Sequence, residues 1–101
     1  MTPDTPNPLY VKLLGETAQI DWPALERFFA QGKLLWVAPA LDLVQAAAAI
    51  ANDDQPQVAA WLTSGEVERM SAETAADLAA RQPALWAVVV SPWVCVQERI
   101  G

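Results

Sequence analysis

The chain has 101 residues, with twelve acidic and six basic side chains, five tryptophans, one cysteine and no histidine. Without histidine, and with a single thiol, zinc sites and histidine-activated serine or cysteine nucleophiles are excluded. The net charge of −6 disfavours nucleic acid as a partner, because the phosphate backbone repels an acidic surface.

The polar, proline-bearing start predicts a flexible tail over residues 1–8, and the length predicts a single compact domain over residues 9–101. No apolar run reaches the ~18–20 residues that a membrane span needs, so we expect no membrane association. The lone cysteine, Cys95, has no partner for an internal disulfide. We therefore expect a bacterial-type cytoplasmic location.

Two helices are expected at the start of the domain. Residues 8–20 form the first, because leucines and Tyr10 recur there at helical spacing. Asp21 begins the second, with Pro23 in its first turn, where the missing N–H is harmless. Gly32 supplies the left-handed residue that ends it.

The middle of the chain is ambiguous. Residues 33–38 predict a strand, since a short apolar run lies between Gly32 and Pro39. Residues 41–52 fit two structures: the alanines at 46–49 favour a helix, whereas the preceding turn and apolar start suit the second strand of a hairpin. We expect the hairpin and keep the helix as the alternative.

Two further helices follow. Asp53 or Asp54 caps the first of them, which ends at Gly65. Ser71 caps the second, over residues 72–81. Between them, the short alternating stretch from Glu66 to Met70 predicts a weak edge strand or an extended link.

Residues 85–90 carry the strongest strand signal, and a run apolar on both faces indicates a sheet covered on both sides. Ser91-Pro92 interrupts it before residues 93–97 continue. Because Ser-Pro is not a favoured two-residue hairpin turn, we expect a bent or bulged strand. The predicted class is α+β, with two N-terminal helices, a small mostly antiparallel sheet and two further helices packed on it.

An ordered series of short motifs also carries a family resemblance. Its members are Glu16-Thr17-Ala18, Asp21-Trp22, Leu25-Glu26-Arg27-Phe28-Phe29, Gly32, Pro39, Leu41-Asp42-Leu43-Val44, Asp53-Asp54, Trp61-Leu62, Gly65 and Val88-Val89-Val90-Ser91-Pro92-Trp93-Val94. In order and spacing the series resembles the small bacterial proteins grouped as domain of unknown function 2288. The resemblance implies a compact stand-alone bacterial domain, and it brings no activity, cofactor or catalytic residue with it.

Carboxylates are the remaining candidates for chemistry. Asp53-Asp54 is the only adjacent acid pair, and Asp42 is the acid that joins it in a possible site for a divalent ion or a general base. Helix capping explains the pair more simply. Cys95 lies between two valines and reads as a core residue. The sequence therefore assigns no catalytic, cofactor-binding or metal-binding residue, and no cofactor is expected.

The tryptophans divide into two groups. Trp22, Trp36, Trp61 and Trp86 fall in helices or strands and are expected in the core. Trp93 follows the predicted strand bend and is expected to be partly exposed. Since tryptophan is enriched at the centres of protein interfaces, Trp93 is the candidate interface residue.

Two functions remain open. The first is a non-enzymatic protein-interaction or regulatory module that pairs with itself or with another protein. The alternative is a carboxylate-based enzyme, or a binder of a small ligand or divalent ion, that uses Asp42, Asp53 and Asp54. The abundance of large apolar side chains in a short chain, together with the missing catalytic residue types, favours the first.

Overall fold

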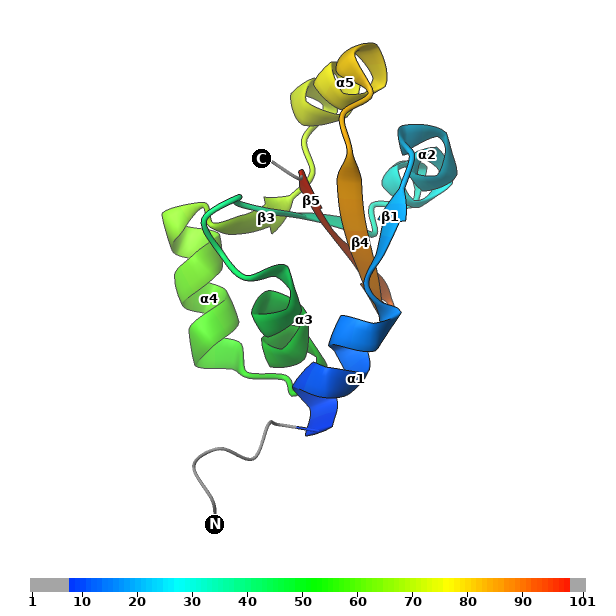
Figure 1. The fold of residues 1–101 in the computed structure, drawn as a ribbon. Coiled ribbons are helices and arrows are strands. Elements are labelled where there is room, and N and C mark those ends of the chain that lie inside the picture. The colour runs from blue at the N-terminus through cyan, green and yellow to red at the C-terminus, as the bar shows by residue number, and fades with distance from the viewer. Residues whose placement is uncertain (1–7, 99–101) are drawn as a thin grey trace.

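The computed structural model describes residues 8–98, which form five helices and five strands. The helices are α1 (Pro8–Glu16), α2 (Trp22–Ala30), α3 (Leu43–Ala51), α4 (Gln55–Ser64) and α5 (Ala72–Arg81). The strands are β1 (Ala18–Ile20), β2 (Leu34–Val37), β3 (Val67–Arg69), β4 (Leu85–Val90) and β5 (Trp93–Glu98) (Figure 1). No helix in this range is long and apolar enough to cross a membrane. The predicted tail lies outside the described residues except for Pro8, which begins α1.

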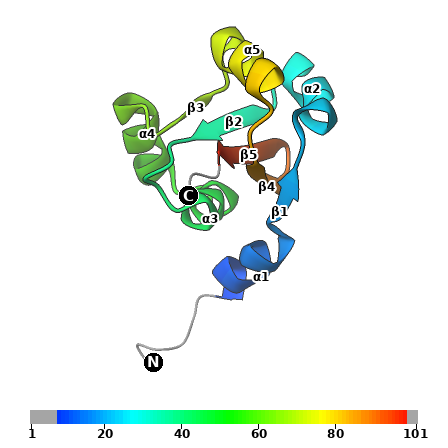
Figure 2. The ribbon, with the colours of Figure 1, turned by 45° about the horizontal axis from the view of Figure 1, so that its top comes forward.

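All five strands belong to one sheet, in the order β1-β4-β5-β2-β3. Neighbouring strands are antiparallel except β2 and β5, which run parallel and lie side by side (Figure 2). The predicted α+β class with a mostly antiparallel sheet is confirmed.

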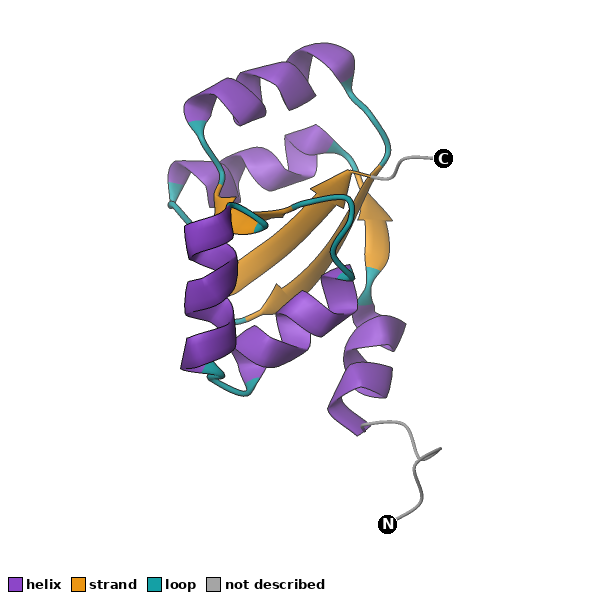
Figure 3. Ribbon diagram, turned by 90° about the vertical axis from the view of Figure 1, so that its left-hand side faces the viewer, coloured by secondary structure: helices purple, strands orange, loops and turns teal. Residues whose placement is uncertain are grey.

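Helices cover both faces of this sheet (Figure 3). On one face α1, α3 and α4 pack over a cluster that includes Leu35 and Val88, and on the other α2 and α5 pack over a cluster that includes Leu85 and Val96. Successive strand residues alternate between the clusters because strand side chains point to opposite faces. This explains the consecutive apolar residues of β4, among which Val89, 57% exposed, is the exception.

The predicted bent or bulged strand around Pro92 is wrong, because β4 and β5 form a hairpin. Val90 pairs with Trp93, so Ser91 and Pro92 are the two turn residues. Their peptide bond is cis, as in a type VI turn. Since Pro92 lies in the turn, its missing N–H leaves the ladder of hydrogen bonds intact.

The first helix is shorter than predicted. It ends at Glu16, and Ala18–Ile20 form the edge strand β1, which pairs with Leu85–Ala87 of β4. Thr17 lies at the change, where its Oγ1 donates to the Leu13 carbonyl at 2.8 Å. The apolar spacing of residues 8–20 predicted a helix that was too long. The edge of β4 offers residues 18–20 backbone hydrogen-bond partners, which the spacing of apolar residues does not indicate.

The hairpin expected over residues 41–52 is also wrong, because this segment contains α3. Asp42 is its N-cap, with Oδ1 accepting from the N–H groups of Val44 at 2.9 Å and Gln45 at 3.3 Å. Ala46 and Ala47 belong to this helix and are fully buried. Their small side chains let the helix axis approach the sheet closely, so the alanines serve packing as well as helix propensity.

Most of the other helix ends lie where the sequence predicted them. Asp54 caps α4 and Ser71 caps α5 through side-chain hydrogen bonds, whereas Asp21 precedes α2 without one. Gly32 and Gly65 follow α2 and α4 with φ of 71° and 81°, values that favour glycine. Strand β2 and the edge strand β3 also lie in their predicted segments.

Candidate functional site

The three candidate carboxylates do not come together in the fold. Asp42 begins α3, and Asp53 and Asp54 follow its other end. Nine helical residues, about 13 Å of axis at ~1.5 Å per residue, separate them. Within residues 8–98, no group of three or more His, Cys, Asp or Glu side chains is placed to hold a metal ion.

Each of these acids has a local hydrogen bond. Besides capping α3, Asp42 accepts from the Tyr10 hydroxyl at 2.7 Å through Oδ2. This bond, with lesser effects of burial and of the Asp42 charge, raises the pKa of Tyr10 above its usual value. Asp54 Oδ1 accepts from the N–H of Gln57 at 3.4 Å, and Asp53 Oδ2 accepts from Gln55 Nε2 at 3.4 Å. Apart from the bond from Tyr10, which joins α1 to the start of α3, these contacts are those of helix caps and turns.

Cys95 is a core residue, as predicted. It is completely buried in β5, and this burial raises the pKa of its thiol to about 12. The thiolate that a cysteine nucleophile needs is therefore strongly disfavoured near neutral pH.

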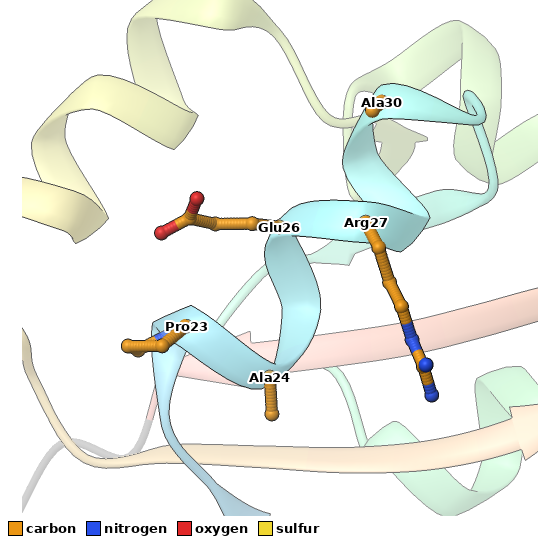
Figure 4. A pocket seen from close by; sticks show the side chains of 5 residues that line it. All are labelled: Pro23, Ala24, Glu26, Arg27 and Ala30. Atoms are coloured by element: carbon orange, nitrogen blue, oxygen red, sulfur yellow. The ribbon is translucent and has the colours of Figure 1, made fainter.

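A broad hollow of about 580 Å³ lies on the outer side of α2 (Figure 4). Its lining residues, from Pro23 to Ala30, all belong to this one helix, and all are exposed. Glu26 and Arg27 point in different directions, and the Arg27 guanidinium instead lies 4.8 Å from the centre of the Phe28 ring. Binding sites are concave and draw on several elements, so this hollow is open helix surface.

A groove at the corner where α3 and α4 meet the sheet has the features of a binding site. It encloses about 410 Å³, within the ~300–1,000 Å³ typical of ligand sites. Apolar side chains from two helices and three strands line it: Leu35, Ile50, Val58, Leu62, Val67 and Trp93. We call this hollow, together with the smaller one that continues it past Leu62 to Asp53, the Trp93 groove.

The sheet register brings the floor of the groove together. Arg69 pairs with Leu35 across β2 and β3, and Leu35 pairs with Cys95 across β2 and β5. Trp93 lies two residues before Cys95, so all of these side chains share one face. On the opposite wall, Val58 and Leu62 are one helical turn apart in α4, and Leu62 is 49% exposed.

Arg69 and Trp93 form one unit at an end of this groove. The guanidinium lies 5.5 Å from the centre of the Trp93 ring, within reach of a cation–π interaction. Its Nη2 donates to the Gly32 carbonyl at 3.1 Å. Two separate contacts thus hold the Arg69 side chain in place.

The groove carries opposite charges at its two ends. Arg69 lines the larger hollow and Asp53 the smaller one, and Ile50, Val58, Leu62 and Trp93 line both. Within residues 8–98, no carboxylate forms an ion pair with Arg69. By contrast, Arg81 Nη2 pairs with Asp77 at 2.6 Å and Glu98 at 2.9 Å, and hydrogen bonds from Arg81 lower the pKa of Asp77.

Sequence reasoning singled out Trp93 but missed its neighbours. Trp22 and Trp61 are buried, and Trp36 and Trp86 are half-buried, as Trp93 is. Partial exposure alone therefore does not distinguish Trp93; its position in the groove does. Two signals pointed to the rest of the site: the i, i+4 spacing of Val58 and Leu62, and the isolation of Arg69 as the first basic residue after Lys33.

The comparisons with known proteins agree with the family suggested by the sequence. A family model described as protein of unknown function (DUF2288) matches residues 8–98. The chain is also similar to PA1075 from Pseudomonas aeruginosa, a protein with a solution NMR structure. The two chains are 50% identical, with coverage of 100% of this chain and 94% of that chain and a TM-score of 0.83. No curated protein matches the chain. Neither matching description names an activity.

Proposed function

The chain belongs to the DUF2288 family of proteins of unknown function, and we propose that it is a non-enzymatic interaction module that binds a protein partner in the Trp93 groove. The observation that carries the proposal is the groove itself, with Leu62 half-exposed above a floor of buried Leu35 and Val67. Covering such apolar surface stabilises a complex by about 25 cal/mol per Å² removed from water.

The Arg69–Trp93 unit adds to this support. Tryptophan and arginine are enriched among the residues that contribute most to binding energy in protein interfaces. Here the two side chains are already in contact, so less side-chain freedom is lost when a partner binds. The remaining reactive groups argue against a catalytic role, because Cys95 is buried and Asp42 and Asp54 cap helices. We also infer a cytoplasmic location from the single cysteine of the sequence.

A matched pair of substitutions tests this function. Leu62→Asp places a charge in the groove, and Leu14→Asp places the same charge on α1. The two leucines are similarly exposed, at 49% and 54%, and each is the third residue from the end of its helix. The effect of the new charge on folding should therefore be similar in both variants.

Tagged wild-type chain and both variants are used for affinity purification from cell extract, with light scattering to measure self-association. We expect wild type and Leu14→Asp to retain the same partner and Leu62→Asp to lose it. Identical retained proteins and identical masses for all three chains would contradict the proposed function.

A further inference from the structure

We propose that the partner segment bound in the Trp93 groove carries a carboxylate that pairs with Arg69, next to the apolar side chains that fill the groove. This inference rests on the proposed function and specifies the chemistry of the partner. It follows from the arrangement of Arg69 and from what would happen to its charge in a complex.

The Arg69 guanidinium has hydrogen-bond donors to spare. A guanidinium carries five N–H donors, and among residues 8–98 the structure shows one acceptor for them, the Gly32 carbonyl at 3.1 Å. The Trp93 ring lies beside the guanidinium, with its centre 5.5 Å from Cζ. The planar fork that remains matches the two oxygens of a carboxylate, which it binds with two parallel hydrogen bonds.

A partner that covers the groove also covers this charge. Arg69 is exposed in the isolated chain, where water satisfies its donors. A segment resting on Trp93 and Leu62 would exclude part of that water, because both residues line the same hollow as Arg69. Burying an unpaired charge is costly, so a segment that fills the groove needs an acceptor at this position. A carboxylate is the acceptor that also neutralises the charge.

The segments at residues 1–7 and 99–101 do not have this composition. Residues 1–7 contain one acid, Asp4, and one large apolar residue, Met1, whereas residues 99–101 contain only Ile100 as a large apolar residue. A single such side chain would leave most of a hollow of about 410 Å³ unfilled. A second copy of the chain is disfavoured by its net charge of −6. We therefore assign the groove to a segment of a different protein.

Selection from a random peptide library provides a defined probe. Phage-displayed peptides are selected on the full chain, and those that also bind Leu62→Asp are discarded. The peptides that remain are the ones that bind the groove. We expect these peptides to contain at least two large apolar residues and an Asp or Glu at a constant spacing from them.

A double-mutant cycle then tests the carboxylate. The selected peptide and its acid-to-amide analogue are titrated against wild type, Arg69→Gln and the control Arg27→Gln. Arg27 also contacts an aromatic ring, Phe28 at 4.8 Å, but lies outside the groove, so both variants lose the same charge and a similar contact. We expect the amide analogue to bind wild type and Arg27→Gln about 10-fold more weakly than the acid, and Arg69→Gln to bind both peptides equally.

The other outcomes separate the two proposals. Groove-binding peptides that lack an acid, or that bind Arg69→Gln as tightly as wild type, would overturn the Arg69 inference and leave the proposed function standing. Failure to recover any peptide sensitive to Leu62→Asp would overturn both. A mass that rises with concentration for wild type but not for Leu62→Asp would identify a second copy as the occupant and overturn the inference.

Discussion

Asp42 offers the sharpest test of whether the acidic residues of this chain are structural. In the structure it accepts three hydrogen bonds: two from backbone N–H groups at the start of α3, at 2.9 and 3.3 Å, and one from the Tyr10 hydroxyl at 2.7 Å. Asp42→Ala removes all three. Asp42→Asn keeps a side-chain oxygen for the cap, and Tyr10→Phe removes only the third bond.

These contacts give the expected magnitudes. Loss of an N-cap side chain costs about 1 kcal/mol, and loss of a solvent-exposed hydrogen bond costs roughly 0.5–1 kcal/mol. Asp42→Ala should therefore lower the free energy of unfolding by about 1.5–2 kcal/mol, and Tyr10→Phe by roughly 0.5–1 kcal/mol. Asparagine caps helices about as well as aspartate, and the Tyr10 oxygen can accept a hydrogen bond from its amide nitrogen, so Asp42→Asn should stay within about 0.5 kcal/mol of wild type.

Urea unfolding followed by tryptophan fluorescence measures these differences, with unchanged slopes as the check on two-state behaviour. In the Asp42→Ala background, Tyr10→Phe should have no further effect, because its partner is already gone. Equal destabilisation by Asp42→Asn and Asp42→Ala would refute the reasoning. The stability of the fold would then depend on the negative charge of Asp42 rather than on its capping oxygen. The capping explanation for this carboxylate would fail, and the alternative function that uses Asp42 would regain support.

Three further predictions concern single residues. Burial raises the pKa of Cys95 from 9.0 to about 12, which implies a stabilising contribution that is complete below pH 9 and lost as the pH rises through 12. Between these pH values, Cys95→Ala should therefore lose less stability than wild type, by about 1 kcal/mol per pH unit. Parallel profiles of stability against pH for the two proteins would contradict this. Gly15→Ala should raise the free energy of unfolding by roughly 0.5–1 kcal/mol, because Gly15 is helical and a β-carbon there meets nothing within 4 Å; a lower melting temperature would show that the contact geometry is wrong. Gly65→Ala should instead cost about 1 kcal/mol in a denaturant titration, because its φ of 81° disfavours a β-carbon, and an unchanged midpoint would argue against that conformation.

The helix boundaries were predictable because their signals are local. Asp54 and Ser71 accept hydrogen bonds from N–H groups three residues further along the chain, and Gly65 adopts a left-handed conformation within its own residue. Such contacts depend only on near neighbours, so a short stretch of sequence contains all the information needed.

The errors arose where contacts between elements of the fold decided the conformation. Ala18–Ile20 continue an apolar helical pattern, but the edge of β4, more than sixty residues away, recruits them as β1. Val90 and Trp93 pair because β4 and β5 are neighbours in the sheet, whatever the preference of the Ser-Pro turn. Leu43–Ala51 fold as a helix whose buried alanines pack in the same cluster as the sheet residues beneath them.

The candidate site shows the same division. Residue types alone excluded histidine chemistry and left Trp93 as a residue of interest, since composition and spacing are properties of the chain. The groove exists only because α4 packs beside β3 and because the sheet register places Arg69, Leu35 and Trp93 on one face. The physical reason is that side-chain direction in a strand follows from pairing register, which non-local hydrogen bonds set. The sequence by itself determined which residue types are available for chemistry, and the tertiary structure alone decided which side chains meet.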